Sequence, residues 1–196
     1  MNLQPDREET HHLFERLFPV YREYCTSVSV RWMALSIETC VYTWWLCEQT
    51  KPKRLVDLGS GFSSYVLRLY QSEHDDVEVV SVDDSPEWLE KTARFLKKHH
   101  LPTDGLLGPD EFLATSGYDL AIYDYSGGEI REAFMAPTME RMNDDGFVIL
   151  DDANHIVHYL WMAKATRDRG WALYSLVEQT LDQVERHAVL AHRGPS

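Results

Sequence analysis

Three aspartates stand directly after short apolar runs of the sequence and could act together. Asp124 follows DLAIY, and Asp151 and Asp152 follow FVIL. If these runs are neighbouring parallel strands, the three carboxylates lie close together at one edge of the sheet. They would repel one another unless protons or a cation lay among them, and neither 119–128 nor 146–155 contains Lys or Arg. The pattern favours a hard divalent cation, with Mg²⁺ as the first candidate. The alternative is that they cap the following helices, as Asp152 could.

A glycine loop follows an earlier apolar run, RLVDL. Its core is Gly59-Ser60-Gly61, and glycines after a strand let the backbone turn sharply and lie against a ligand. Asp57 would repel a pyrophosphate at this loop but suits a cationic ligand. Asp83, 22 residues after Gly61 at the end of the next apolar run, could accept hydrogen bonds from both hydroxyls of a ribose. The alternative is a tight strand–helix turn that binds nothing.

These motifs resemble those of the class I S-adenosylmethionine-dependent methyltransferases. RLVDLGSGFSS is similar to their first motif, acidic-x-Gly-x-Gly, and VVSVDDSPEWL to their second strand and the helix after it. The likeness covers roughly residues 30–192 and implies S-adenosylmethionine as cofactor. Asp57, Gly59 and Gly61 would then approach its methionine part, and Asp83 its ribose. The other implied cofactor positions are Ser60, Ser63, which stands where many members have a third glycine, and Asp110, where members contact the adenine edge.

Two further segments narrow the resemblance. YDLAIYD and GFVILDD look like the metal-dependent O-methyltransferases, both the catechol type and the antibiotic sugar type, and the Asp-Asp pair favours the second. This likeness implies that Asp124, Asp151 and Asp152 hold Mg²⁺ and that the acceptor is a small hydroxylated molecule. The chain departs from the catechol type at Gly127, where that type carries a lysine general base.

The general base must therefore come from elsewhere. His155 and His158 lie just beyond the Asp pair and would share a helix face because they are three residues apart. A surface histidine pair is the alternative. The metal could also lower the pKa of a bound hydroxyl, with Asp124 receiving the proton.

The pattern along the chain predicts an α/β fold with a doubly wound, mostly parallel, Rossmann-like sheet. Residues 1–50 are predicted to form an N-terminal helical cap, and 51–196 the S-adenosylmethionine-binding domain, as one compact unit. The cap helices are expected at 7–24, with a break or kink at Pro19, and at 31–49. Strands are expected at 54–58, 77–82, 105–107, 119–123, 147–150, 172–177 and 187–191, and helices at 63–71, 86–99, 129–143 and 154–168. In the resembled family the last two strands form an antiparallel hairpin.

Composition limits the partners. The chain has 196 residues, 19 Lys and Arg against 32 Asp and Glu, and a formal charge of −13. This charge argues against a broad basic face that binds nucleic acid. The longest uncharged run in the Trp-rich stretch, Thr39–Cys47, is far shorter than the ~18 residues of a membrane span. With three cysteines, no disulfide pattern and no secretory signal, we expect a cytoplasmic protein. The N-terminal helices could mediate a homodimer.

Three other functions stay open at this stage. One is a metal-free methyltransferase of the same fold that acts on nitrogen or on a macromolecule. Another is a nicotinamide-dependent oxidoreductase, although its pyrophosphate would find no third glycine and would face Asp57. The last is a non-catalytic relative that keeps only the nucleoside pocket.

Overall fold

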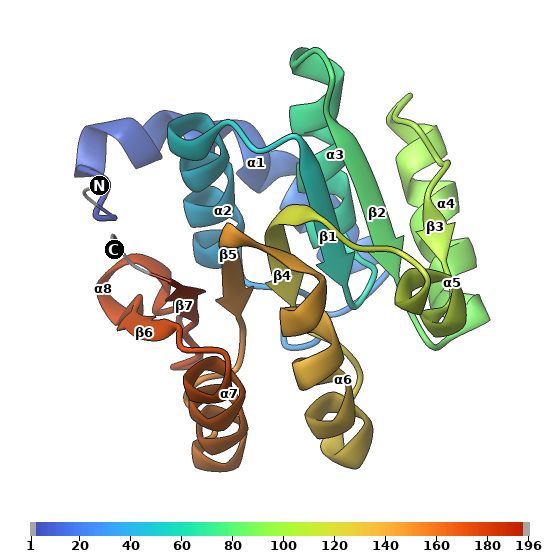
Figure 1. Cartoon of the computed structure of the whole chain (residues 1–196). Helices are drawn as coiled ribbons and strands as arrows, with labels where there is room; N and C mark the ends of the chain where they lie inside the picture. Colours follow the sequence, from blue (N-terminus) through green and yellow to red (C-terminus); the bar gives the residue numbers. More distant parts are fainter. Residues whose placement is uncertain (1–2, 194–196) are drawn as a thin grey trace.

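The computed structural model describes residues 3–193 as seven strands and eight helices (Figure 1). In chain order the elements are α1 (Arg7–Ser27), α2 (Ile37–Thr50), β1 (Arg54–Leu58), α3 (Phe62–Glu73), β2 (Glu78–Val82), α4 (Pro86–Lys98), β3 (Leu106–Leu107), α5 (Pro109–Leu113), β4 (Tyr118–Tyr123), α6 (Gly128–Arg141), β5 (Met142–Leu150), α7 (Ile156–Asp168), β6 (Ala172–Ser175), α8 (Val177–Thr180) and β7 (Val189–His192).

The strands form one sheet in the order β3-β2-β1-β4-β5-β7-β6. The first five strands of this order are parallel, whereas β7 runs antiparallel to both β5 and β6. The predicted fold class and the C-terminal hairpin are therefore confirmed. The chain reverses its direction of travel across the sheet between β1 and β4, and ligands of open α/β sheets bind at such a switch point.

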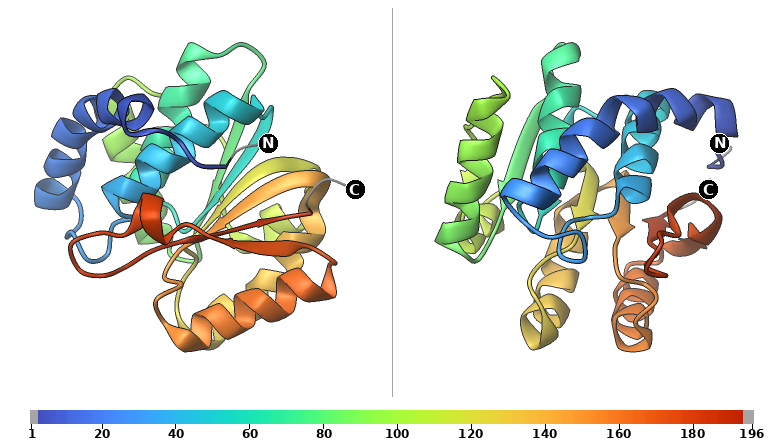
Figure 2. Two further views of the ribbon diagram at one scale, coloured as in Figure 1. Left: turned by 90° about the vertical axis from the view of Figure 1, so that its left-hand side faces the viewer. Right: turned by 180° about the vertical axis from the view of Figure 1, so that it is seen from behind.

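Helices cover both faces of the sheet, because neighbouring residues of each strand point to opposite faces. Leu55 of β1 packs with α1, α2 and α3 in one core cluster. Val56 and Leu58 pack on the other face, where α6 and α7 contribute Met135, Met139 and Met162. Figure 2 shows these two helical layers on either side of the sheet.

The N-terminal helices belong to the first of these cores. Leu13 and Leu17 of α1 and Leu46 of α2 are buried in the same cluster as Leu55 and Ile122 of the sheet. Helices α1 and α2 of the predicted cap are thus packed directly on the sheet that carries the predicted site. Within residues 3–193, no helix combines the length and the apolar character that crossing a membrane requires.

Several predicted boundaries differ from the observed ones. The helix predicted at 31–49 is wrong at its start: α2 begins at Ile37, and Ser36 caps it by accepting a hydrogen bond from the backbone N–H of Thr39 at 3.1 Å. Helix α1 continues through Pro19 without a break. Strand β5 begins at Met142, ahead of the predicted 147, and the short helices α5 and α8 were not predicted.

Candidate functional site

A cavity of about 470 Å³ lies at the carboxyl ends of β1, β2, β4 and β5. Its volume is in the range of small-molecule sites. Four strand ends and two distant segments line it: Gly59–Ser63 after β1, Asp83–Ser85 and Trp88 after β2, Asp124, Ser126 and Arg131 after β4, Asp151 and Asp152 after β5, Tyr24, Ser29 and Trp32–Leu35 from the N-terminal part, and Arg186. The predicted glycine loop therefore meets four of the predicted carboxylates, Asp83, Asp124, Asp151 and Asp152, at one cavity.

The glycine loop has a conformation that only glycine adopts easily. Gly59 has φ +98°, and a Cβ there would lie 2.1 Å from the carbonyl oxygen of Asp124. The absent side chain thus lets the end of β1 lie directly against the end of β4. Gly61 precedes α3 and faces the Tyr24 hydroxyl, which would lie 3.0 Å from an added Cβ.

Asp57 lies beneath this loop and is not among the residues that line the cavity. The residue is fully buried, and its carboxylate accepts a hydrogen bond from the Ser64 hydroxyl, whose oxygen accepts one from the Gly61 N–H at 3.1 Å. Burial is the largest influence and raises the pKa of Asp57 to about 6, although hydrogen bonds from Ser64 and Ser63 and the charge of Arg68 act in the opposite direction. In this arrangement Asp57 holds the loop in place. Its predicted contact with a cofactor stays a prediction.

The buried Asp57 predicts a pH-dependent stability. Below about pH 4 the group is protonated in both the folded and the unfolded state, and as the pH rises to about 6 only the folded state resists ionisation. The folded state therefore loses about 3 kcal/mol of stability relative to the unfolded state over this interval. We expect Asp57→Asn to lack this loss. The difference in free energy of unfolding between the variant and wild type, measured by urea denaturation, should therefore increase in favour of the variant between pH 4 and 6. Parallel curves for the two proteins would contradict this account.

Asp83 accepts hydrogen bonds from the glycine loop and from its own loop. Its Oδ2 accepts from the Ser60 N–H (2.8 Å) and hydroxyl (2.9 Å), and its Oδ1 accepts from the Ser85 N–H (2.9 Å). Burial raises the pKa of Asp83 against these hydrogen bonds. With about four acceptor positions on a carboxylate, one position of Asp83 stays available. Asp84 lines the same cavity, is exposed, and accepts from the Ser126 hydroxyl at 3.1 Å.

Asp124, Asp151 and Asp152 converge as the strand ends predicted. Each offers a carboxylate oxygen, and these three oxygens lie within 4.8 Å of one another. Burial, and then repulsion from Asp151, raises the pKa of Asp124 well above its ordinary range. Burial, and then repulsion from Asp152, raises the pKa of Asp151 to about 7. Within the described chain, Asp151 Oδ1 is buried and has no hydrogen-bond partner.

A cation from the protein itself reaches this cluster. The Arg131 Nη1 lies 3.3 Å from Asp124 Oδ1 and 3.2 Å from Asp152 Oδ2, and its Nη2 donates to the Asp151 carbonyl at 3.1 Å. The segments next to the aspartates contain no Lys or Arg, but Arg131 follows Asp124 by seven residues. It lies in the first turns of α6. Sequence reasoning missed it, and the only signal was its proximity to Asp124 in the chain.

His155, His158 and Asp110 are not among the residues that line the cavity. His155 is the exposed N-cap residue of α7, and its ring centroid lies 5.2 Å from that of His158. Burial, and then the charge of Arg131, lowers the pKa of His158. Asp110 is exposed on α5. The cavity carboxylates are therefore better placed than these histidines to receive a proton from a ligand.

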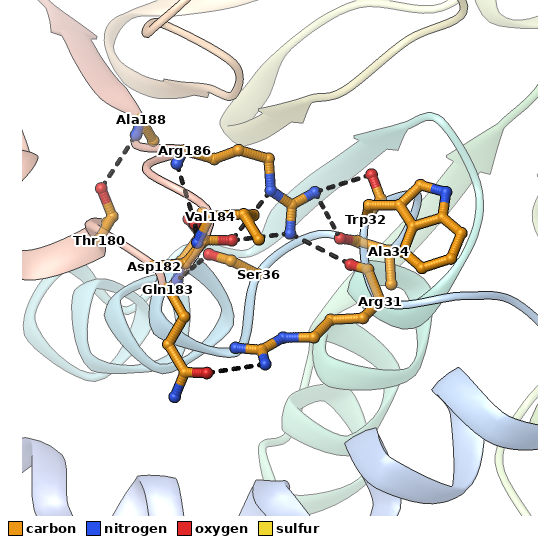
Figure 3. A network of polar contacts seen from close by, with 11 residues as sticks. Arg31, Trp32, Ala34, Ser36, Thr180, Asp182, Gln183, Val184, Arg186 and Ala188 are labelled. Atoms are coloured by element: carbon orange, nitrogen blue, oxygen red, sulfur yellow. Dashed lines mark hydrogen bonds and ion pairs between the residues drawn. The ribbon is translucent and has the colours of Figure 1, made fainter.

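Arg186 connects two segments near the cavity, the one that contains Asp182 and residues 31–34 (Figure 3). Its guanidinium donates to Asp182 Oδ2 at 2.9 Å and to the carbonyl oxygens of Arg31 (3.2 Å), Trp32 (3.2 Å) and Ala34 (3.1 Å). These contacts hold residues 31–34 outside any helix, which explains why the predicted helix starts late. They also place Trp32, 72% exposed, at the edge of the cavity.

No protein-family model and no curated protein sequence matches the chain. Solved structures do resemble it. The O-methyltransferase TomG from Streptomyces achromogenes, in complex with SAM, has a TM-score of 0.67 at 14% identity over 96% of this chain and 90% of its own. The SAH-bound methyltransferase PaMTH1 from Podospora anserina has 0.67 at 15% identity over 98% of both chains. An O-methyltransferase from Bacillus cereus, in complex with SAH, has 0.69 at 11% identity over 95% of this chain and 90% of its own. The chain therefore has the fold of the class I methyltransferases.

Proposed function

We propose that the protein is an S-adenosylmethionine-dependent methyltransferase that acts on an oxygen atom of a small hydroxylated acceptor. One observation carries the proposal. A single cavity is lined by the glycine loop, by Asp83 and by the carboxylates of Asp124, Asp151 and Asp152, at the switch point of a methyltransferase fold. Residues suited to a nucleoside and residues suited to accepting a proton therefore line the same cavity.

The residues around the loop suit the cofactor. Phe62 and Ser63 open α3, whose N-terminus carries unpaired N–H groups and a partial positive charge that favour the cofactor's carboxylate. Asp83 has one acceptor position for a ribose hydroxyl, and the neighbouring Asp84 supplies others. The pair would share a task that the sequence assigned to Asp83 alone.

The part of the cavity around Asp124 and Asp151 would align the acceptor and supply a group that takes its proton. When bound, S-adenosylmethionine supplies an electrophilic methyl group. Asp124 or Asp151 would take the proton from the acceptor hydroxyl, and a base whose pKa lies near 7 is well matched to that step. Trp32 and Met33 would cover the outer side of the acceptor. Holding the acceptor oxygen in line with the methyl group is the main contribution expected from the protein.

Mg²⁺ assistance is the finer part of the sequence prediction. Asp124, Asp151 and Asp152 would hold the ion, which when bound would polarise the acceptor oxygen. Their oxygens converge as such a site requires. Arg131, however, already lies against two of the three carboxylates, and a guanidinium cannot ligate a metal. The residues present therefore do not fit an open divalent site, and the proposed reaction does not pass through the ion.

Cofactor binding is tested by calorimetric titration with S-adenosylhomocysteine, with NAD as the control ligand. We expect Asp83→Ala and Asp84→Ala each to weaken binding about 10- to 100-fold, because each removes a hydrogen bond to a charged group. Asp110→Ala, at an exposed position on α5, is the control variant. Weaker binding of S-adenosylhomocysteine by this variant would support the predicted contact of Asp110 with adenine. Binding of NAD with no binding of S-adenosylhomocysteine would overturn the proposal.

Catalysis is tested with S-adenosylmethionine labelled in its methyl group and a panel of small hydroxylated and amine acceptors. Label transferred to oxygen supports the proposal. Label transferred only to nitrogen or to a macromolecule would favour the alternative of the same fold that acts on those acceptors. The position of Arg131 supports a metal-free reaction and does not distinguish oxygen from nitrogen as the acceptor. Tight cofactor binding without transfer to any acceptor would indicate a non-catalytic relative.

A further inference from the structure

The guanidinium of Arg131 is built into the carboxylate cluster. The residue is 2% exposed, and one of its nitrogens bridges Asp124 Oδ1 and Asp152 Oδ2 at 3.3 and 3.2 Å. Its other terminal nitrogen donates to the backbone carbonyl of Asp151 at 3.1 Å. One side chain thus contacts all three residues that the sequence assigned to a metal ion.

A hydrogen bond to its backbone carbonyl positions Arg131 next to the end of β4. The Tyr123 hydroxyl donates a hydrogen bond to the Arg131 carbonyl, and Tyr123 immediately precedes Asp124 at the end of β4. Both Tyr123 and Arg131 are buried. The Tyr123 hydrogen bond therefore holds the backbone of Arg131 next to the end of β4, and the side chain, unlike that of a surface arginine, is buried where it contacts the carboxylates.

The other nearby arginine has different partners. Arg186 influences the pKa values of Asp124 and Asp151 through its charge, but its nitrogens are hydrogen-bonded to Asp182 and to three backbone carbonyls. Arg131 is thus the cation in direct contact with the carboxylates among the residues that the structure describes. An arginine stays charged at any physiological pH, so this counterion is permanent.

We infer that Arg131 takes the place of a divalent metal ion as the counterion of Asp124, Asp151 and Asp152. Mg²⁺ requires a nearly octahedral set of oxygens at 2.0–2.1 Å, and a guanidinium among the same oxygens repels it and blocks ligand positions. The site then functions without added metal. Metal-free turnover at this site rests on the proposed methyl transfer, whereas the role of Arg131 as counterion does not.

The inference predicts that removing Arg131 creates a metal site. Arg131→Met keeps an unbranched apolar stem as far as the position of Nε and leaves three converging carboxylates without the guanidinium. Mn²⁺, followed by electron paramagnetic resonance, is the probe. We expect wild type to show no saturable binding below about 1 mM, and Arg131→Met to bind one Mn²⁺ per chain at least about 30-fold more tightly. Mn²⁺ should also raise the melting temperature of the variant only.

Controls separate this effect from a general change in charge. Arg141→Met removes another arginine of α6, which bonds to the carbonyls of Pro137 and Leu113, and should gain no Mn²⁺ site. Arg131→Met combined with Asp151→Asn should lose the new site. If Arg131→Met does not fold, Arg131→Gln provides a neutral side chain that can still donate one hydrogen bond.

Wild-type titration alone can overturn the inference. One tightly bound Mn²⁺ in wild type, lost in Asp151→Asn, would show that Arg131 yields to a metal. A folded Arg131→Met or Arg131→Gln that gains no Mn²⁺ would also contradict it. Neither result depends on S-adenosylhomocysteine binding, so a failure of the proposed function would be recognised separately.

Discussion

Gly59→Ala should lower the free energy of unfolding by more than about 3 kcal/mol. The φ of +98° is strained for any residue with a side chain, and the new methyl group would lie 2.1 Å from the backbone oxygen of Asp124. Because this neighbour is backbone at the end of a buried strand, it cannot move aside as a flexible side chain could. The end of β1 must therefore separate from the end of β4.

Urea denaturation measures this loss, and Gly127→Ala is the matched control. Gly127 precedes α6 with φ −141°, and an added Cβ there would meet no atom within 4 Å. We expect the control to stay within about 0.5 kcal/mol of wild type. If Gly59→Ala folds with wild-type stability and binds S-adenosylhomocysteine normally, then the contact between the two strand ends does not define the cavity.

The second large effect is expected from Arg186→Ala, at about 3–5 kcal/mol. Asp182 has a side chain that is only 1% exposed, and the substitution would leave its carboxylate buried without its cation. Three carbonyl oxygens of residues 31–34 would lose their donor at the same time. The loss should exceed that of Arg167→Ala, whose side chain is 77% exposed and whose ion pair with Asp168 spans 3.9 Å.

A double-mutant cycle with Asp182→Ala separates the two contributions. We expect the double variant to lose clearly less stability than the sum of the single variants, because it buries no unpaired charge. Trypsin should also cleave after Arg31 faster in Arg186→Ala than in wild type. Additive losses together with unchanged cleavage would show that Arg186 does not hold this segment.

The sequence predicted the elements well where their signals were local. The helix at 86–99 was expected from Ser85-Pro86, and α4 begins at Pro86 with the Ser85 hydroxyl accepting from the Trp88 N–H. The start of α2 could not be predicted, because the conformation of residues 31–34 depends on Arg186, more than 150 residues further along the chain.

The candidate site could likewise be predicted where its position follows from the strands, but not where it depends on contacts between elements. The meeting of Asp124, Asp151 and Asp152 follows from strand ends that share one edge of a parallel sheet. The contribution of Arg131 could not be deduced, because it depends on how α6 turns back over the end of β4. Asp57 was expected at the mouth of the loop, yet its side chain points under the loop toward Ser64.

The contacts of Arg186 also have a consequence for synthesis on the ribosome. The carbonyls of residues 31–34 emerge early, whereas the side chain that binds them is added 152 to 155 positions later. Contacts between such distant segments form late in folding, because a long loop must close first. A nascent chain that lacks Arg186 therefore has an incomplete cavity wall, because neither this lining residue nor its bonds to the three carbonyls are present.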